Sequence, residues 1–237
     1  MIDKTKKYFI NNPIFIKAKT KFNVFKLTRI RRIKKINVNE RIVELPFVFN
    51  CLPKKGNLDI LDLGCAESSL SLHMASLGHK VVGVDMREFP YRHPNFKFSK
   101  ADIMDLGFKD KSFDIVSCIS TLEHIGLGFY KDRADCQLPD KKALNEIYRV
   151  LKDDGLLILS VPFGVYQESL QQRIYDLEHL DVLLDNFSIN IRLFFADFKD
   201  QDLNFWREID QDQAKKMKSS DGTTNCICLI KAAKANI

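Results

Sequence analysis

Three aspartates stand in or directly after short apolar runs in the first half of the chain. Asp62 lies two residues before Gly64. Asp85 ends the run VVGVD, and Asp102 follows the next predicted strand. Carboxylates accept hydrogen bonds from hydroxyls and amines and attract a cation. The three aspartates therefore predict a site for a polar ligand that carries positive charge and hydroxyl groups.

Glu123 and His124 come shortly after the fourth apolar run, FDIVSCI. Histidine titrates near neutral pH, so His124 is a candidate base for a hydroxyl proton, and Glu123 is a candidate for the same role or for a metal ligand. Adjacent residues on regular structure cannot both face one ion, and no second carboxylate accompanies them. We therefore predict no metal site, with a purely structural role for both residues as the alternative.

The segment from residue 57 to residue 85 predicts one complete βαβ unit. The apolar run Leu58–Leu63 predicts a buried parallel strand, closed by a tight turn at Gly64. Residues 67–77 predict a helix with its first turn at Glu67 to Ser69, and residues 80–85 predict the second strand. A ligand crevice opens at the carboxyl ends of such strands.

The rest of the chain alternates between strand and helix patterns. We expect strands over 95–99, 113–119, 156–161, 187–195 and 225–232, and helices over 39–52, 139–151 and 175–184. The first helix is expected to be capped by Asn39 and interrupted at Pro46, and Arg41 and Glu44 in it either pair on the surface or line a cofactor pocket. Residues 196–224 read as an acidic, aromatic insertion. The alternation predicts an α/β fold: a doubly wound, seven-stranded, mostly parallel sheet with helices on both faces.

Charge is distributed unevenly along the 237 residues, whose net charge is +6. Residues 1–56 hold 15 Lys and Arg against three acidic residues, and the remainder holds 22 against 28. We expect a basic extension over residues 1–37, followed by one domain over 38–237. The extension is either a solvated helix that covers part of the domain or an arm in peripheral contact with anionic membrane through residues 1–36. Its lysines precede no uninterrupted apolar core, so a signal peptide is not expected.

The six cysteines are scattered, with no disulfide framework or zinc spacing. A reducing, cytoplasmic compartment is the simplest expectation.

The glycine turn separates two ligand classes. A dinucleotide fingerprint requires glycine at positions 64, 66 and 69, but only Gly64 is present, with Ala66 and Ser69 at the others. S-adenosylmethionine brings an ammonium and a sulfonium where a dinucleotide brings a pyrophosphate, so the acid at Asp62 favours S-adenosylmethionine.

At these residues the sequence resembles the class I S-adenosylmethionine-dependent methyltransferases. ILDLGCAES looks like the first motif of the family, GVD the second, ADIMDL the third and FDIVSCISTLEHI the fourth, and YRVLKDDGLLILSVP is similar to the segment that leads into the fifth strand. The resemblance covers residues 59–163 and implies a Rossmann-like sheet with an antiparallel last strand. It departs from the family at Ala66 and Ser68, where glycine is usual.

The resemblance also implies how S-adenosylmethionine is bound. Residues near the turn would hold the methionine moiety, one carboxylate the ribose and another the adenine. The cofactor-binding residues expected on this basis are Asp62, Gly64, Cys65, Ala66, Ser68, Asp85, Met86, Asp102, Ile103 and Ser120.

Methyl transfer to a hydroxyl acceptor is the leading functional prediction. The stretch Leu-Glu-His-Ile is similar to quinone-pathway O-methyltransferases, and residues 172–187 look like methyltransferase-domain proteins found beside saccharide-assembly enzymes. The expected acceptor is thus a saccharide or small-molecule hydroxyl. The alternative is a catalytically inactive scaffold docked on membrane or a partner. Nucleic-acid methylation is not favoured, because no Asn/Asp-Pro-Pro-aromatic motif follows the fourth strand.

Overall fold

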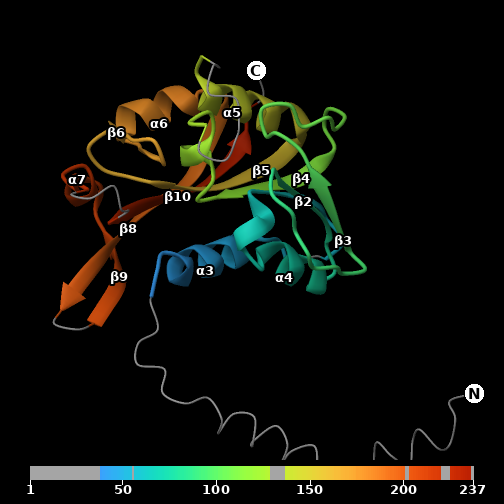
Figure 1. Cartoon of the computed structure of the whole chain (residues 1–237), viewed down its shortest axis with the longest axis horizontal. Helices are drawn as coiled ribbons and strands as arrows, with labels where there is room; N and C mark the ends of the chain where they lie inside the picture. The colour runs from blue at the N-terminus through green and yellow to red at the C-terminus, as the bar shows by residue number, and fades with distance from the viewer. Residues whose placement is uncertain (1–37, 55, 129–136, 201–202, 220–224, 236–237) are drawn as a thin grey trace, which may run out of the picture. The chain divides into compact units, whose positions relative to one another are not determined.

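The computed structural model describes residues 38–237 apart from 55, 129–136, 201–202, 220–224 and 236–237 (Figure 1). The predicted basic extension lies outside the described residues, so its boundary and its membrane contact stay predictions. In the part that is described, no helix combines the length and the apolar character needed to cross a membrane.

One eight-stranded sheet, in the order β3-β2-β1-β4-β5-β10-β8-β9, forms the centre of the fold. Strands β3, β2, β1, β4 and β5 are parallel, and β10 is antiparallel to both β5 and β8. The predicted α/β fold with an antiparallel last strand is confirmed. The strands are β1 (Asp59–Leu63), β2 (Lys80–Asp85), β3 (Phe96–Lys100), β4 (Phe113–Ile119), β5 (Leu151–Pro162), β8 (Phe187–Asp200), β9 (Leu203–Ile209) and β10 (Cys226–Lys234).

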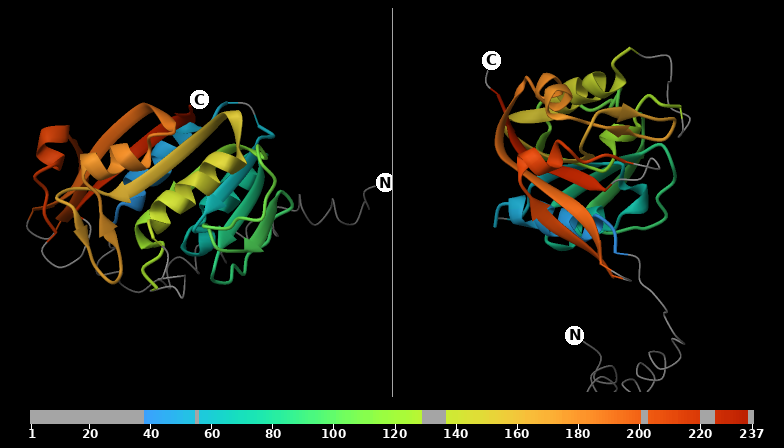
Figure 2. Two further views of the ribbon diagram at one scale, coloured as in Figure 1. Left: turned by 90° about the horizontal axis from the view of Figure 1, so that it is seen from above. Right: turned by 90° about the vertical axis from the view of Figure 1, so that its left-hand side faces the viewer.

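The eighth strand, β9, replaces most of the irregular insertion expected from the sequence. It pairs antiparallel with β8, which continues to Asp200 instead of ending at 195. Figures 1 and 2 show this hairpin extending beyond the rest of the sheet. Residues 205–209, FWREI, do not alternate between apolar and polar types, so the sequence lacks the period-two pattern of a strand there.

Helices cover both faces of the sheet (Figure 1). Helices α3 (Arg41–Cys51) and α4 (Leu70–Ser76) pack on one face, and α5 (Pro139–Val150) and α6 (Leu177–Leu183) on the other. Shorter elements are two 3₁₀ turns, η1 (Cys65–Glu67) and η2 (Leu122–His124), a hairpin of β6 (Gln167–Glu168) and β7 (Arg173–Ile174), and α7 (Gln211–Ala214). Two apolar cores, one on each face, result.

Helix α3 corrects two expectations. It continues through Pro46 without interruption, and its cap position is Glu40, whose side chain makes no cap hydrogen bond, instead of Asn39. Proline removes one intrahelical donor, the partner of the Ile42 carbonyl. Ile42 is 56% exposed, so water can satisfy this carbonyl and the helix tolerates the loss.

The turn after β1 depends on Gly64. This residue has φ +75°, and its N–H donates to the Val84 carbonyl at 2.8 Å, which ties the turn to β2. Helix α4 begins at Leu70, three residues later than predicted, because η1 intervenes and the Ser68 hydroxyl accepts from the Leu70 N–H. A Cβ atom at position 64 would overlap the Thr121 hydroxyl and lie 2.6 Å from Thr121 Cγ2.

Gly64→Ala is expected to destabilise the protein more than Gly78→Ala. Gly78 also has a positive φ, +94°, but a Cβ atom there meets nothing within 4 Å. Both variants incur the left-handed backbone cost of about 1–2 kcal/mol, and only Gly64→Ala adds the collision with Thr121. Urea unfolding of both variants measures the difference; equal losses of unfolding free energy would show that Thr121 moves aside freely.

Candidate functional site

A cavity of about 220 Å³ opens at the carboxyl ends of β1, β2 and β4. Eight of the twelve predicted site residues line it: Gly64, Asp85, Met86, Asp102, Ile103, Ser120, Glu123 and His124. The fold thus collects residues from four separate sequence segments, as parallel strands require. The roles of these residues in binding and catalysis stay predictions.

Asp62 lies beneath the cavity and does not line it. Its carboxylate is 2% exposed and accepts hydrogen bonds from the hydroxyls of Ser71 and Ser117, the latter at 2.7 Å. Burial raises the pKa of Asp62 in spite of these hydrogen bonds. Asp62 therefore links β1 to β4 and to the start of α4, and supports the glycine turn from below.

Cys65, Ala66 and Ser68 also lie outside the cavity lining. The Cys65 side chain is buried in the core on the α3–α4 face. The Ala66 N–H donates to Asp85 Oδ2 at 3.0 Å, and the Ser68 hydroxyl accepts from Leu70. These residues shape the turn, and Ala66 additionally fixes the orientation of Asp85.

Asp85 ends β2, and its carboxylate accepts four hydrogen bonds. Oδ1 accepts from the backbone N–H and Nε of Arg87 at 2.9 and 3.0 Å, and Oδ2 accepts from the Ala66 N–H and from Arg87 Nη2 at 3.0 and 3.1 Å. Burial alone would raise the pKa of Asp85, but the hydrogen bonds from Arg87 and Ala66 hold it below the ordinary value. Asp85 is thus ionised, and its four lone-pair positions are occupied.

Asp102 and Ile103 form the adjacent part of the wall. Asp102 is half-buried, and its Oδ1 accepts from the Met104 N–H at 2.9 Å. Ile103 is 9% exposed and packs into the core on the α5–α6 face. One carboxylate and one apolar side chain thus stand side by side in the wall, a combination suited to the edge and face of a planar ring.

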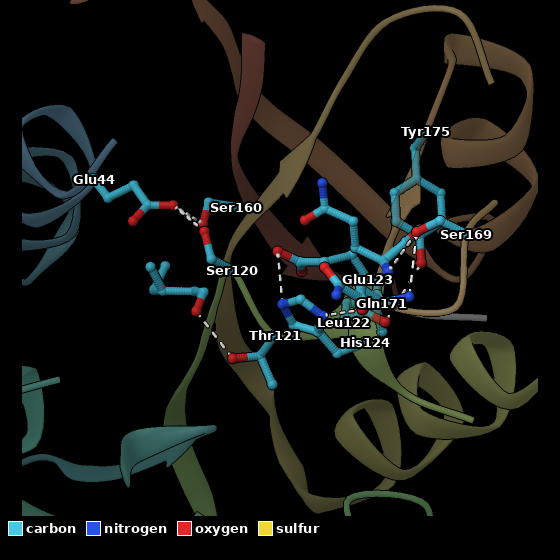
Figure 3. Close-up of polar contacts among 12 residues, drawn as sticks. Glu44, Ser120, Thr121, Leu122, Glu123, His124, Ser160, Ser169, Gln171 and Tyr175 are labelled. Atoms are coloured by element: carbon cyan, nitrogen blue, oxygen red, sulfur yellow. Dashed lines mark hydrogen bonds and ion pairs between the residues drawn. The ribbon is translucent and has the colours of Figure 1, made fainter. Parts of the chain in front are cut away.

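A buried glutamate connects α3 to the cavity, a feature the sequence did not reveal. Glu44 is fully buried, and its Oε1 accepts from the hydroxyls of Ser120 and Ser160 at 2.6 and 2.5 Å (Figure 3). Its Oε2 accepts from Arg41 Nη1 at 2.7 Å. The expected pairing of Arg41 with Glu44 exists, but its glutamate lies in the interior. Arg41 and Glu40 line the cavity.

Glu123 and His124 occupy η2, just after β4 (Figure 3). His124 Nδ1 lies 2.6 Å from the carbonyl oxygen of Gln171. A carbonyl only accepts, so we assign the proton to Nδ1, and in the neutral ring Nε2 is the nitrogen able to take up a proton. Nε2 lies 3.9 Å from Glu123 Oε1.

The Glu123 carboxyl is the most perturbed acid of the cavity. It is 2% exposed, and its Oε2 is buried with no hydrogen-bond partner. Burial raises the pKa of Glu123 to about 8. A carboxyl that changes charge near neutral pH beside an imidazole is suited to proton transfer. Across the described ranges, no three His, Cys, Asp or Glu side chains converge as metal ligands.

Comparison with known proteins finds a methyltransferase domain in part of the chain. Residues 61–159 match the methyltransferase domain. The chain is 26% identical over 140 residues to an uncharacterised protein of Methanocaldococcus jannaschii, covering 50% of this chain and 55% of that protein. It is 29% identical over 119 residues to the putative methyltransferase YqeM of Bacillus subtilis, covering 46% and 44%. Over 94 residues it is 29% identical to the ubiquinone biosynthesis O-methyltransferase of Albidiferax ferrireducens, covering 35% and 37%. The chain spans about half or less of the length of these relatives.

Solved structures share the fold at low sequence identity. A putative S-adenosylmethionine-dependent methyltransferase of Listeria monocytogenes aligns with a TM-score of 0.57 at 16% identity, covering 83% of this chain and all of that one. The 1,6-didemethyltoxoflavin-N1-methyltransferase of Burkholderia thailandensis, solved with bound substrate and S-adenosylhomocysteine, aligns with a TM-score of 0.51 at 16% identity, covering 76% and 72%. Residues 61–159 thus match a methyltransferase domain, and the fold is the one seen in S-adenosylmethionine-dependent methyltransferases, which supports the class I family expected from the sequence.

Proposed function

We propose that this chain transfers a methyl group from S-adenosylmethionine to a hydroxyl of a saccharide or another small molecule. The observation that carries the proposal is that Asp85, Asp102, Glu123 and His124 all line the same cavity. The first two suit the nucleoside, and the last two suit a proton-transfer site. The lining of this cavity thus holds candidate residues for the methyl donor and for the methyl acceptor.

Asp85 and Asp102 are suited to bind the nucleoside part of S-adenosylmethionine. A carboxylate at the end of β2 can accept from both ribose hydroxyls, and Asp102 with Ile103 can accept from the adenine amino group and pack on the ring. Since four donors already occupy Asp85, the ribose hydroxyls must replace the two guanidinium donors of Arg87. The N–H groups of Ala66 and Arg87 can stay in place.

Arg41 and the turn at Gly64 are suited to bind the methionine part of S-adenosylmethionine. The Arg41 guanidinium lines the cavity and is held by Glu44. A guanidinium recognises a carboxylate through paired N–H groups, so we place the carboxylate of the methionine moiety near Arg41. The turn at Gly64 lies in the same wall, and Asp62 acts from beneath by fixing that turn.

His124 is suited to deprotonate the acceptor hydroxyl. When bound, S-adenosylmethionine supplies an activated methyl group on its sulfonium. His124 Nε2 takes the proton of the acceptor hydroxyl as the oxygen–carbon bond forms, and the Gln171 carbonyl holds the ring in the required tautomer. Glu123 Oε1 lies 3.9 Å from Nε2, and once ionised, above its raised pKa of about 8, this carboxylate stabilises the imidazolium. Alignment of donor and acceptor in the cavity contributes up to about 7–11 kcal/mol.

The state of the cysteines bears on the cellular compartment. The five cysteines of the described residues are free and buried, in keeping with a reducing compartment, and we propose a cytoplasmic location. The relative from Albidiferax ferrireducens is named as an O-methyltransferase, which supports oxygen as the acceptor atom. Contact of the basic extension with anionic membrane remains part of the proposal.

Asp85→Ala is expected to weaken binding of S-adenosylmethionine about 10- to 100-fold, because it removes a charged acceptor of the ribose hydroxyls. Isothermal titration calorimetry measures this. Asp154→Ala, an exposed aspartate beyond the cavity lining, is the matched control and should bind as the wild type does. No binding heat in the wild type at millimolar cofactor would contradict the enzyme.

His124→Ala is expected to lower kcat about 10²- to 10⁴-fold while leaving cofactor affinity within twofold, because the base is lost and the nucleoside contacts are not. Methyl transfer to a saccharide panel, followed by mass spectrometry, gives the rates. The control is His73→Ala, an exposed histidine on α4. A kcat within twofold of the wild type would exclude His124 as the base.

Glu123→Gln is expected to flatten the pH dependence of stability. The folded-state pKa of about 8 lies above the ordinary 4.5, so between these values the folded state binds more protons than the unfolded state. The free energy of unfolding then falls as pH rises, by up to about 1.4 kcal/mol per unit, and levels off above the folded pKa. Urea unfolding from about pH 6 to about pH 9 tests this. The exposed Glu88→Gln should retain the wild-type slope; an unchanged slope in Glu123→Gln would refute the raised pKa.

A further inference from the structure

A second cavity, of about 520 Å³, lies directly beside the first. Its walls come from α6, the first turn of α5, the β6–β7 segment and residues 126–127. None of the roles described so far uses it. Its volume is large enough for a sugar-sized group.

The two cavities share a wall made by two chain segments. Ile125 and Gln172 line the first cavity, and their sequence neighbours Gly126 and Arg173 line the second. Arg173 Nη1 donates to the Ile125 carbonyl at 2.7 Å, and this bond joins the segments. The same segments carry His124 and its partner Gln171. A molecule in the second cavity therefore sits next to the residues that orient the proposed base.

A flat aromatic surface forms part of the second cavity. The rings of Tyr166 and His179 stack with centroids 3.8 Å apart and planes 6° from parallel. Asp176 fixes His179, with Nδ1 at 2.7 Å from Oδ1. Tyr166 remains 38% exposed. Aromatic faces carry partial negative charge and attract the weakly positive C–H groups on one side of a sugar ring.

The charges of the second cavity disfavour an anionic ligand. Asp140, Glu168 and Glu178 supply three carboxylates to its lining. The guanidinium of Arg173 is 7% exposed and is neutralised by Glu168, with Nε and Oε2 2.7 Å apart. Burial first, and then Glu168, raises the pKa of the Tyr166 hydroxyl, which agrees with a negative local field. Carboxylates without a matching surplus cation accept hydrogen bonds from neutral hydroxyl groups.

We propose that the second cavity binds the non-reacting part of the acceptor and that this part is a neutral saccharide unit. The inference rests on the proposed function, because it assumes that the reacting hydroxyl reaches His124 in the first cavity. The Tyr166–His179 stack carries the apolar side of the sugar ring, and Glu178 and Asp140 accept from its hydroxyls. The acceptor would then pass over the edge of the shared wall, with one unit in each cavity.

Saturation-transfer NMR on the full chain tests the inference. The probes are lactose, cellobiose, maltose and chitobiose, with glucose 6-phosphate as the anionic probe and glucosamine as the cationic one. We expect millimolar binding of at least one neutral disaccharide and none of glucose 6-phosphate. Tyr166→Ala should weaken that binding roughly tenfold, whereas Tyr166→Phe should retain it because the ring face remains. Tyr91→Ala, another exposed tyrosine, is the matched control.

The outcomes separate this inference from the proposed function. Cofactor titration of the same samples reports on the first cavity, and Tyr166→Ala should bind S-adenosylmethionine as the wild type does. Cofactor binding without binding of any neutral disaccharide would overturn the saccharide inference alone. So would tighter binding of glucose 6-phosphate or glucosamine, or disaccharide binding that Tyr166→Ala leaves unchanged. Disaccharide binding without cofactor binding would keep the second site and refute the methyltransferase proposal.

Discussion

The buried carboxylate of Glu44 is the interaction on which the cavity depends. It accepts from Ser120 at the end of β4, from Ser160 in β5 and from Arg41 on its own helix. Ser120 has φ +43°, a backbone conformation that is unfavourable for any residue except glycine. Such strain persists only where the surrounding structure holds the residue in place. By holding Ser120, Glu44 directs the chain into η2 and at the same time places Arg41 in the cavity wall. Because Glu44 is fully buried, loss of these partners would leave its carboxylate uncompensated in the interior, which is destabilising.

Glu44 and Glu123 show how environment separates two carboxyl groups near one cavity. Both are almost completely buried. Glu44 has a cationic partner and two hydroxyl donors, whereas Glu123 leaves Oε2 without a partner and has its pKa raised to about 8. Burial, with Oε2 left without a hydrogen-bond partner, favours the neutral acid at Glu123. The first carboxyl is therefore suited to structure and the second to proton transfer, a division also typical of paired acids in catalytic sites.

Local patterns in the sequence predicted the parallel strands, the glycine turn and most of the cavity lining, because strand periodicity and a carboxylate after an apolar run are local features. The role of Glu44 could not be predicted, since Ser160 is 116 residues away in sequence. Asp62 was expected in the cavity because its motif position suggested it, but Ser71 and Ser117 hold it beneath the turn. Strand β9 could not be predicted from its own composition, because its pairing with β8 decides its structure.

The arrangement of Asp85 and Arg87 resolves an apparent conflict between a preformed site and ligand binding. A carboxylate that accepts from four donors has no lone pair to offer. Two of these donors belong to the Arg87 side chain, which is 35% exposed, and the other two are backbone N–H groups. The Arg87 guanidinium also contacts Glu67, a carboxylate that is 71% exposed on the cavity rim. If ribose hydroxyls bind Asp85 as proposed, the guanidinium can turn to Glu67 and keep an ionic partner. In this exchange the Asp85 carboxylate replaces guanidinium donors with hydroxyl donors, so it avoids the cost of several kcal/mol of leaving a buried charge unpaired. Without a ligand, Arg87 keeps Asp85 ionised and oriented.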